Sequence, residues 1–353
     1  AVMSRRNKNR VWTGALLAAG GALGLSWVRY RREIRRQRLR VSTGSLIADT
    51  PGGPIEYAIA GAGSPVLVVH GAGGGYDQGL SIAGPLADRV FRLIAMSRFG
   101  YLRTPLPADA SAEAQADAHA RLLDALGVSR AAVVGASAGA PSAMQFALRH
   151  PDRASALVLL VPAAYTPRPG GAASVRTASE RMPSGTGFLL QAFLGSDFAF
   201  WAAIRLALPL VTRGILGTPP EVLESADAAE KARVARILEE ILPISARRAG
   251  LLNDAAVVSS LPRYELERIA VPTLAISAAD CLYGTFDGAR YTAENVPGAR
   301  FIGYPTGGHM TVGRHEEILA EIADFLEHRA LWGAGIVDPV AHAGSQEGSQ
   351  LPA

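Results

Sequence analysis

The stretch that decides the fold reads Val133-Val134-Gly135-Ala136-Ser137-Ala138-Gly139 and lies between an apolar run and a stretch of helical composition. It has the form G-x-S-x-G in a strand–turn–helix context, the pattern of a sharp turn with a serine hydroxyl at its tip. Because the turn is tight, the flanking residues must be small, and Gly135 and Gly139 meet that need. Such turns are common in a chain rich in alanine and glycine, so the interpretation depends on the surrounding pattern.

Apolar runs typical of buried strands recur on both sides of this turn. They cover residues 65–69, 91–95, 131–134, 156–161, 271–277 and 299–304. Amphipathic helical patterns lie between or after them, as at 112–126, where Ser111 is the expected N-cap, and at 316–328. Apolar strands that alternate with helices predict an α/β fold with a doubly wound, mostly parallel sheet. Residues 41–60 are expected to add two strands joined by a turn.

The alternation changes between residues 162 and 262. A strongly apolar stretch at 186–216 is followed by a charged helical pattern from Glu221 to Leu242. Charged residues and proline interrupt the apolar stretch too often for a membrane span, so we expect a helical cap insertion over the active site. Seven apolar side chains suggest either an apolar substrate or the core of the cap itself: Phe188, Leu189, Leu190, Phe193, Phe198, Phe200 and Trp201.

Positive charge is concentrated at one end of the chain. Residues 1–40 hold eleven of the 35 Lys and Arg residues and one of the 31 Asp and Glu residues, which leaves 24 basic and 30 acidic residues elsewhere. This mildly acidic remainder argues against a nucleic-acid-binding body. Cys281 is the only cysteine, so no intramolecular disulfide or cysteine-cluster metal site is possible. The histidines show no metal-ligand spacing, and we expect no metal and no cofactor.

An uncharged run from Val11 to Val28 has basic residues on both sides. As a helix it would span about 27 Å, close to the hydrocarbon thickness of a bilayer, and Trp12, Trp27 and Tyr30 lie near its ends. The sequence therefore predicts a single-pass transmembrane anchor and a membrane location, and the larger positive charge after the run favours a cytoplasmic body. The alternatives are a cleaved signal peptide and a buried helix, which the basic flanks disfavour.

Two further side chains complete a catalytic pattern with Ser137. A serine hydroxyl needs a base to take its proton and a third group to orient that base. Asp280 follows the apolar strand at 271–277, and His309 follows the last strand in a glycine-rich loop. The predicted catalytic residues are thus Ser137, Asp280 and His309, with Asp287 and His315 as rivals for the second and third positions.

A glycine-rich loop follows the first buried strand and His70, which is expected to position the loop. We expect two backbone N–H groups to hold the developing oxyanion, those of Ala138 and Ala72, with Gly73 as the alternative to Ala72. A phosphate-binding loop is disfavoured because no Gly-Lys-Ser/Thr follows.

Together, His70-Gly71, the Ser137 turn, Asp280 and Gly308-His309 resemble the α/β-hydrolase superfamily over residues 45–330. The segment Ser97–Tyr101 also resembles the family's R-G-x-G-x-S region, although Phe99 replaces the usual small residue. The resemblance implies the fold and a serine-type triad but not the substrate, because members hydrolyse esters, lactones, amides and the carbon–carbon bonds of dienoic ketones, and others are perhydrolases that need no cofactor. Ser137 argues against the members that use an aspartate nucleophile.

We therefore expect a serine hydrolase that cleaves carboxylic esters of a small, apolar substrate. A carbon–carbon bond hydrolase and a perhydrolase are the enzymatic alternatives, and a non-catalytic binding protein and a membrane-tethered scaffold are the others. The sequence makes no prediction of oligomeric state. The predicted organisation is a basic segment at 1–10, a transmembrane anchor at 11–28, a basic juxtamembrane segment at 29–44, an α/β-hydrolase core at 45–162 and 263–330, a helical cap at 163–262 and a disordered tail at 331–353.

Overall fold

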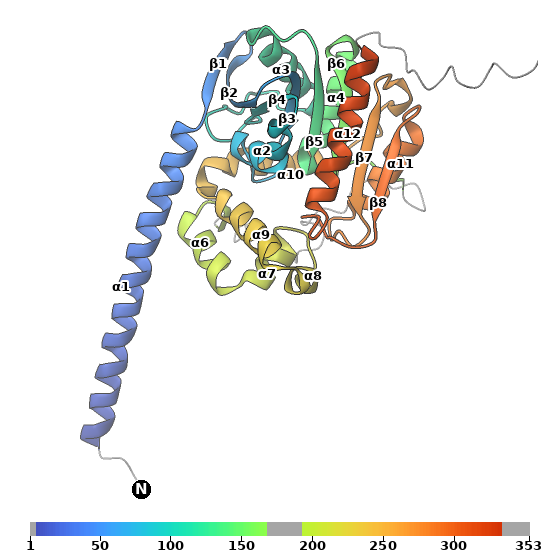
Figure 1. Ribbon diagram of the computed structural model, residues 1–353. Coiled ribbons are helices and arrows are strands. Elements are labelled where there is room, and N and C mark those ends of the chain that lie inside the picture. Colours follow the sequence, from blue (N-terminus) through green and yellow to red (C-terminus); the bar gives the residue numbers. More distant parts are fainter. Residues whose placement is uncertain (1–4, 168–192, 334–353) are drawn as a thin grey trace, which may run out of the picture.

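A single mixed sheet forms the centre of the molecule (Figure 1). The structure is a computed structural model and describes residues 5–167 and 193–333. Within these residues the sheet has eight strands in the order β1-β2-β4-β3-β5-β6-β7-β8. Their bounds are β1 Leu46–Thr50, β2 Gly53–Gly61, β3 Ser64–Val69, β4 Phe91–Met96, β5 Ala131–Ala136, β6 Ala154–Leu160, β7 Thr273–Ala278 and β8 Arg300–Tyr304. The first two strands pair antiparallel and β3 to β8 run parallel, which confirms the predicted fold class.

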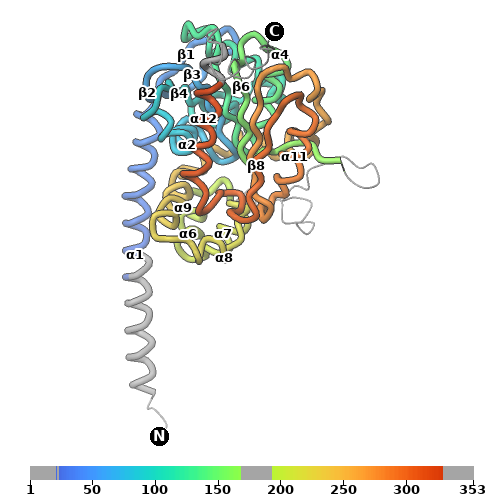
Figure 2. The backbone as a smooth tube through the Cα atoms, turned by 45° about the vertical axis from the view of Figure 1, so that its right-hand side comes forward, coloured from blue at the N-terminus to red at the C-terminus, as the bar shows by residue number. Residues whose placement is uncertain are grey.

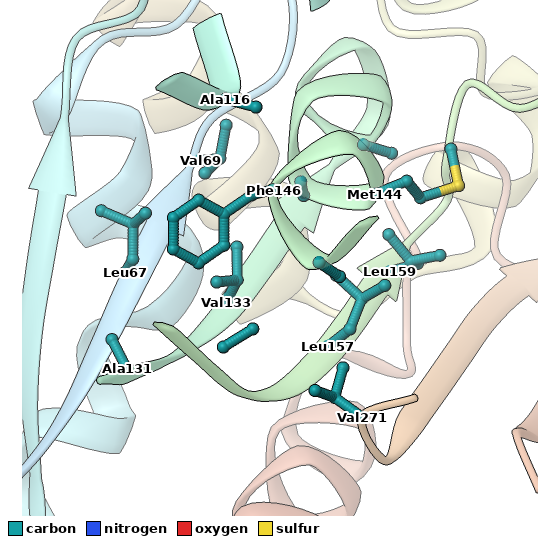
Figure 3. Packing of buried hydrophobic residues seen from close by; sticks show 14 of the residues in the cluster. Leu67, Val69, Ala116, Ala131, Val133, Met144, Phe146, Leu157, Leu159 and Val271 are labelled. Carbon is teal, nitrogen blue, oxygen red and sulfur yellow. The ribbon is translucent and has the colours of Figure 1, made fainter. Parts of the chain in front are cut away.

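Helices cover both faces of the sheet because successive strand residues point to opposite sides. In β3, Leu67 and Val69 pack on the face that carries α3 Ala112–Ala125, α4 Ala140–Arg149 and α11 Thr285–Asn295. Figure 3 shows these two side chains beside Phe146 of α4. Val66 and Val68 pack on the opposite face, against α2 Tyr76–Ala83 and α12 His315–Gly333. Apolar residues on both faces explain why the strands read as continuous apolar runs.

Side-chain caps set two helix boundaries. The Ser111 hydroxyl accepts the N–H of Ala114 at 3.2 Å, so the predicted N-cap of α3 is confirmed. The charged pattern that predicted one helix from Glu221 to Leu242 instead forms two, α8 Pro220–Ser225 and α9 Ala228–Glu240. Asp227 separates them because its carboxylate accepts the N–H of Glu230 at 2.8 Å and starts a new helix.

The helices between β6 and β7 gather at one end of the sheet (Figures 1 and 2). We call them the inserted helices: α6 Asp197–Leu206, α7 Leu208–Gly214, α8, α9 and α10 Arg248–Ser259. Their own apolar core includes Phe200, Trp201 and Leu238. Phe188, Leu189 and Leu190 of the predicted apolar set lie outside the described residues.

The N-terminal helix α1 runs from Arg5 to Thr43. In the described part of the chain no helix is both long enough and apolar enough to cross a membrane. This finding contradicts the transmembrane anchor predicted at 11–28, and with it the predicted membrane location and membrane partner.

Aromatic and charged side chains at the carboxyl end of that segment contact the inserted helices instead. Tyr30 is buried, with its ring 5.1 Å from Phe198 and 5.7 Å from Trp201. Glu33 accepts hydrogen bonds from Trp201 Nε1 at 3.1 Å and from Arg205 at 2.6 Å. The membrane interpretation of Tyr30 was wrong because an amphipathic ring suits a protein interface as well as a lipid headgroup region.

Two predicted segments lie partly outside the described residues. The basic segment at 1–10 is described from Arg5, where α1 already begins. The predicted tail at 331–353 is described only to Gly333, the last residue of α12.

Candidate active site

Ser137 stands at the turn between β5 and α4 with a φ of 49°, a left-handed conformation that is rare for a serine. The flanking glycines leave room for this turn. A Cβ atom at Gly135 would lie 2.6 Å from Ala143 Cβ, and one at Gly139 would lie 2.5 Å from the His70 carbonyl oxygen. The strand, the turn and the helix therefore require small residues on both sides of the serine, and the serine side chain projects from the turn.

His309 reaches Ser137 from the loop between β8 and α12. Its Nε2 lies 2.9 Å from Ser137 Oγ although the two residues are 172 positions apart in the chain. When Nε2 accepts the hydroxyl proton, Nδ1 carries the ring proton of the neutral imidazole. The Tyr283 ring packs edge-on against the imidazole, with 4.9 Å between centroids. The structure thus brings the predicted nucleophile and base within hydrogen-bond distance.

Asp280 contacts the backbone of the same loop rather than the His309 ring. Its carboxylate accepts the N–H of Gly307 at 3.1 Å and that of Gly308 at 2.7 Å. The described hydrogen bonds include none between this carboxylate and the His309 ring, so the expected contact is not made. The atom next to His309 Nδ1 is Cys281 Sγ, at 3.3 Å.

The two rival residues have other surroundings. Asp287 is on the exposed side of α11, where it pairs with Arg290 at 3.3 Å. His315 lines the same cavity as His309. Burial and the nearby Arg233 guanidinium lower its pKa to about 4, so its ring is neutral near neutral pH.

His70 holds the glycine-rich loop, as expected. Its buried ring contacts the Gly71 carbonyl oxygen through Nδ1 at 2.7 Å and accepts the N–H of Arg98 at Nε2 at 2.9 Å. Burial and the Arg98 guanidinium lower the pKa of His70 well below its usual value. Gly73 and Ala72 both line the cavity beside Ser137, but Gly73 donates its N–H to Tyr101 Oη at 3.3 Å. Of the two predicted amides in this loop, that of Gly73 already has a partner.

A buried network of charged residues, which the sequence did not predict, supports the glycine-rich loop. Arg98 pairs with Asp254 of α10 through two hydrogen bonds of 2.6 and 2.7 Å. Tyr101 donates to the same carboxylate at 2.5 Å, and burial together with Asp254 raises the pKa of Tyr101 well above its usual value. The network connects the loop after β4 to an inserted helix. Arg98 was visible in the Ser97–Tyr101 motif, but no sequence signal identified its partner.

A second network connects the loop to α1. Asp77 accepts hydrogen bonds from Arg247 and from Arg40, each at 2.6 Å. Arg247 also donates to the Gly74 carbonyl oxygen. Burial raises the pKa of Asp77, but the two guanidiniums outweigh burial and hold the pKa at about 2. The carboxyl end of α1 is therefore tied to the glycine-rich loop.

A cavity of about 460 Å³ opens onto Ser137 and His309. The chain between β6 and β7, comprising the inserted helices and the segments that join them, supplies most of its apolar wall, including Phe200, Ile237, Ile241 and Leu251. Of the predicted apolar set, Phe193 and Phe200 line the cavity, whereas Trp201 and Phe198 pack against α1. A serine–histidine pair on the floor of an apolar chamber suits the attack of an oxygen nucleophile on a bound carbonyl group.

Comparisons with known proteins agree with this architecture. A solved α/β-hydrolase fold protein from Nakamurella multipartita is 28% identical with a TM-score of 0.64, and the match covers 81% of this chain and 99% of that one. The enol-lactonase from Burkholderia xenovorans has a TM-score of 0.62 at 19% identity, with 80% of this chain and all of that one covered, which shows the fold alone.

Sequence relatives match over a shorter length. The 2-hydroxy-6-oxo-6-phenylhexa-2,4-dienoate hydrolase of Comamonas testosteroni is 33% identical over 113 residues, which are 31% of this chain and 40% of that protein. The chain thus aligns with well under half the length of the curated relatives it matches first. A family model described as alpha/beta hydrolase fold matches residues 64–315. The chain therefore belongs to the α/β-hydrolase family.

Proposed function

We propose that the protein is a serine hydrolase that cleaves carboxylic esters of apolar small molecules. The observation that carries the proposal is the 2.9 Å contact between Ser137 Oγ and His309 Nε2 at the floor of an apolar cavity. His309 takes the hydroxyl proton as Ser137 Oγ attacks the ester carbonyl carbon. The oxyanion accepts hydrogen bonds from the backbone N–H groups of Ala72 and Ala138, each worth about 10²–10³-fold in rate.

The remaining steps use the same groups. The protonated His309 donates its proton to the alcohol oxygen as the carbon–oxygen bond breaks, which leaves an acyl group on Ser137. A water molecule then loses a proton to His309, attacks the acyl carbon and releases the acid. In this proposal the inserted helices act as a cap that surrounds the apolar part of the substrate and limits the access of water.

A carbon–carbon bond hydrolase is the second candidate, because the Comamonas relative is named as a dienoate hydrolase. Such a substrate brings a carboxylate into the cavity. Arg233 lines the cavity, but both its Nε and Nη2 donate to Glu230, at 2.7 and 2.9 Å, and Nη2 donates to the Met310 carbonyl oxygen. A carboxylate substrate would have to compete with Glu230 for this guanidinium, which favours the neutral ester.

The test uses purified wild type, Ser137→Ala and Ser259→Ala, which removes an exposed hydroxyl on α10. Each is measured with aryl esters of increasing acyl length, with a dienoic ketone and with a fluorophosphonate probe. We expect Ser137→Ala to lower kcat by about 10⁶-fold and to abolish labelling, while Ser259→Ala matches wild type. Full esterase activity in Ser137→Ala would overturn the proposal, and faster turnover of the dienoic ketone would select the second candidate.

A further inference from the structure

The third position beside the catalytic imidazole is occupied by a sulfur atom. His309 faces Ser137 with Nε2 and Cys281 with Nδ1, at 2.9 and 3.3 Å. The neighbouring residue in the chain is Asp280, and its carboxylate accepts hydrogen bonds from the two backbone amides that precede His309. The two neighbouring residues therefore have different contacts, because Asp280 binds the backbone of the histidine loop and Cys281 contacts the histidine ring.

The buried surroundings of Cys281 present hydrogen-bond donors to its sulfur atom. Cys281 Sγ is buried, with the residue only 7% exposed, and Thr285 Oγ1 donates to it at 3.1 Å. Ser277 Oγ lies 2.9 Å from Thr285 Oγ1. Because the single proton of the Thr285 hydroxyl points to the sulfur, Ser277 donates to Thr285, and the two hydroxyls form a chain that ends on Cys281. With His309 Nδ1–H, two donors converge on one sulfur atom, an arrangement that favours a thiolate.

We propose that Cys281 is the positioning residue of the Ser137–His309 pair, in the role that the sequence assigned to Asp280. Its sulfur accepts the Nδ1–H of His309, which fixes the ring orientation and leaves Nε2 free to take the serine proton. As a thiolate it also stabilises the imidazolium that forms when Ser137 attacks. This inference rests on the proposed function, because a positioning role requires that His309 act as the base.

A thiolate in this position makes the activity depend on pH differently from a carboxylate. Burial raises the pKa of the Cys281 thiol, but His309 and the Thr285 hydroxyl outweigh burial and bring the pKa to about 7. His309 accepts the serine proton with full support only when its ring is neutral and Cys281 is a thiolate.

Other charged and titratable groups face this pair. Asp280 and Tyr283 lie on the same loop, and Tyr283 packs on the His309 ring. His315 and Arg233 line the cavity, and Glu230 pairs with Arg233 and accepts the N–H of Gly313. All of them are kept unchanged in the variants below, apart from one control at Asp280.

The experiment compares wild type with Cys281→Asp, Cys281→Ala and Asp280→Asn, using an aryl ester whose turnover is lost in Ser137→Ala. We expect Cys281→Ala to lower kcat by about 10²-fold or more with little change in KM, because the ring loses its orienting partner. Cys281→Asp should restore kcat to within about tenfold of wild type, because a carboxylate accepts the same Nδ1–H. The profile of kcat/KM in wild type should keep rising through the thiol pKa, whereas this rise should be absent from the profile of Cys281→Asp.

A second readout does not need catalysis. Cys281 is the only cysteine, so the ultraviolet absorbance of the thiolate, measured as wild type minus Cys281→Ser, reports this residue alone. We expect the thiolate to form near pH 7 in wild type and only at a clearly higher pH in His309→Ala. Absence of Ser137-dependent turnover in wild type would refute the proposed function. The thiol titration would still test whether His309 interacts with Cys281.

The inference is overturned if Cys281→Ala keeps wild-type kcat and its pH profile while Asp280→Asn loses about 10²-fold or more, since Asp280 would then orient the ring. It is also overturned if the thiol titrates identically with and without His309. Circular dichroism and unfolding curves of wild type and every variant separate these outcomes from a failure to fold.

Discussion

Removal of the Asp254 carboxylate is expected to destabilise the protein strongly. Asp254 makes two hydrogen bonds to Arg98 and accepts one from Tyr101, and all three residues are buried. Asp254→Ala leaves the Arg98 guanidinium buried without its counter-charge, which costs about 3–5 kcal/mol. That is a large fraction of the roughly 5–15 kcal/mol by which domains are stable, so the variant should unfold at much lower urea concentration.

A double variant tests this reasoning. Arg98→Met combined with Asp254→Leu removes both charges, so the double variant should be more stable than Asp254→Ala by about 1 kcal/mol or more. The matched control is Asp287→Ala, whose ion pair with Arg290 is exposed and should contribute less than about 1 kcal/mol. The free energy of unfolding is measured by urea titration followed by circular dichroism. A loss below about 1 kcal/mol in Asp254→Ala, or equal losses in Asp254→Ala and Asp287→Ala, would refute the argument.

Three further predictions concern the turn, the pH dependence and the cavity. Gly139→Ala should lower kcat for aryl esters by at least about 10-fold, because the added Cβ would lie 2.5 Å from the His70 carbonyl oxygen and displace Ser137. Unchanged kinetics would contradict this prediction. The pKa of Asp77 is about 2 in the folded protein, below its reference value of 3.8. Its ion pairs therefore add about 2 kcal/mol to the free energy of unfolding above pH 4, and this contribution is lost as the pH falls toward 2. Urea titrations of Asp77→Asn across this range should show a flatter pH dependence than wild type, and identical slopes would count against the assignment. Ile237→Trp should shorten the acyl chain length preferred in the ester series, since this side chain lines the cavity, and an unaltered preference would exclude Ile237 from the acyl site.

The sequence was most informative where one element dictates its own geometry. The turn around Ser137 needs small residues at fixed offsets, and the strand pattern needs apolar residues on both faces, so both can be read from local spacing. The sequence also predicted His309 as the partner of Ser137, and the structure places its Nε2 2.9 Å from Ser137 Oγ, because the parallel strands bring their carboxyl ends to one edge of the sheet.

The sequence misled where one pattern serves two environments. Trp27 and Tyr30 were assigned to a membrane boundary, but Tyr30 and the nearby Glu33 contact α6. Amphipathic rings and charged side chains satisfy their polar atoms equally well at either boundary, and only the presence of Phe198, Trp201 and Arg205 opposite them decides between the two.

The chain by itself determined the α/β fold and the tight turn around Ser137, because these depend on local periodicity and on residue size. Only the tertiary structure decided which side chain meets His309 Nδ1. Asp280 and Cys281 are adjacent in sequence, and the path of the loop after β7 turns one toward the Gly307 and Gly308 amides and the other toward the ring. The same holds for Asp254, since a carboxylate on an inserted helix finds its arginine through packing that no spacing in the sequence encodes.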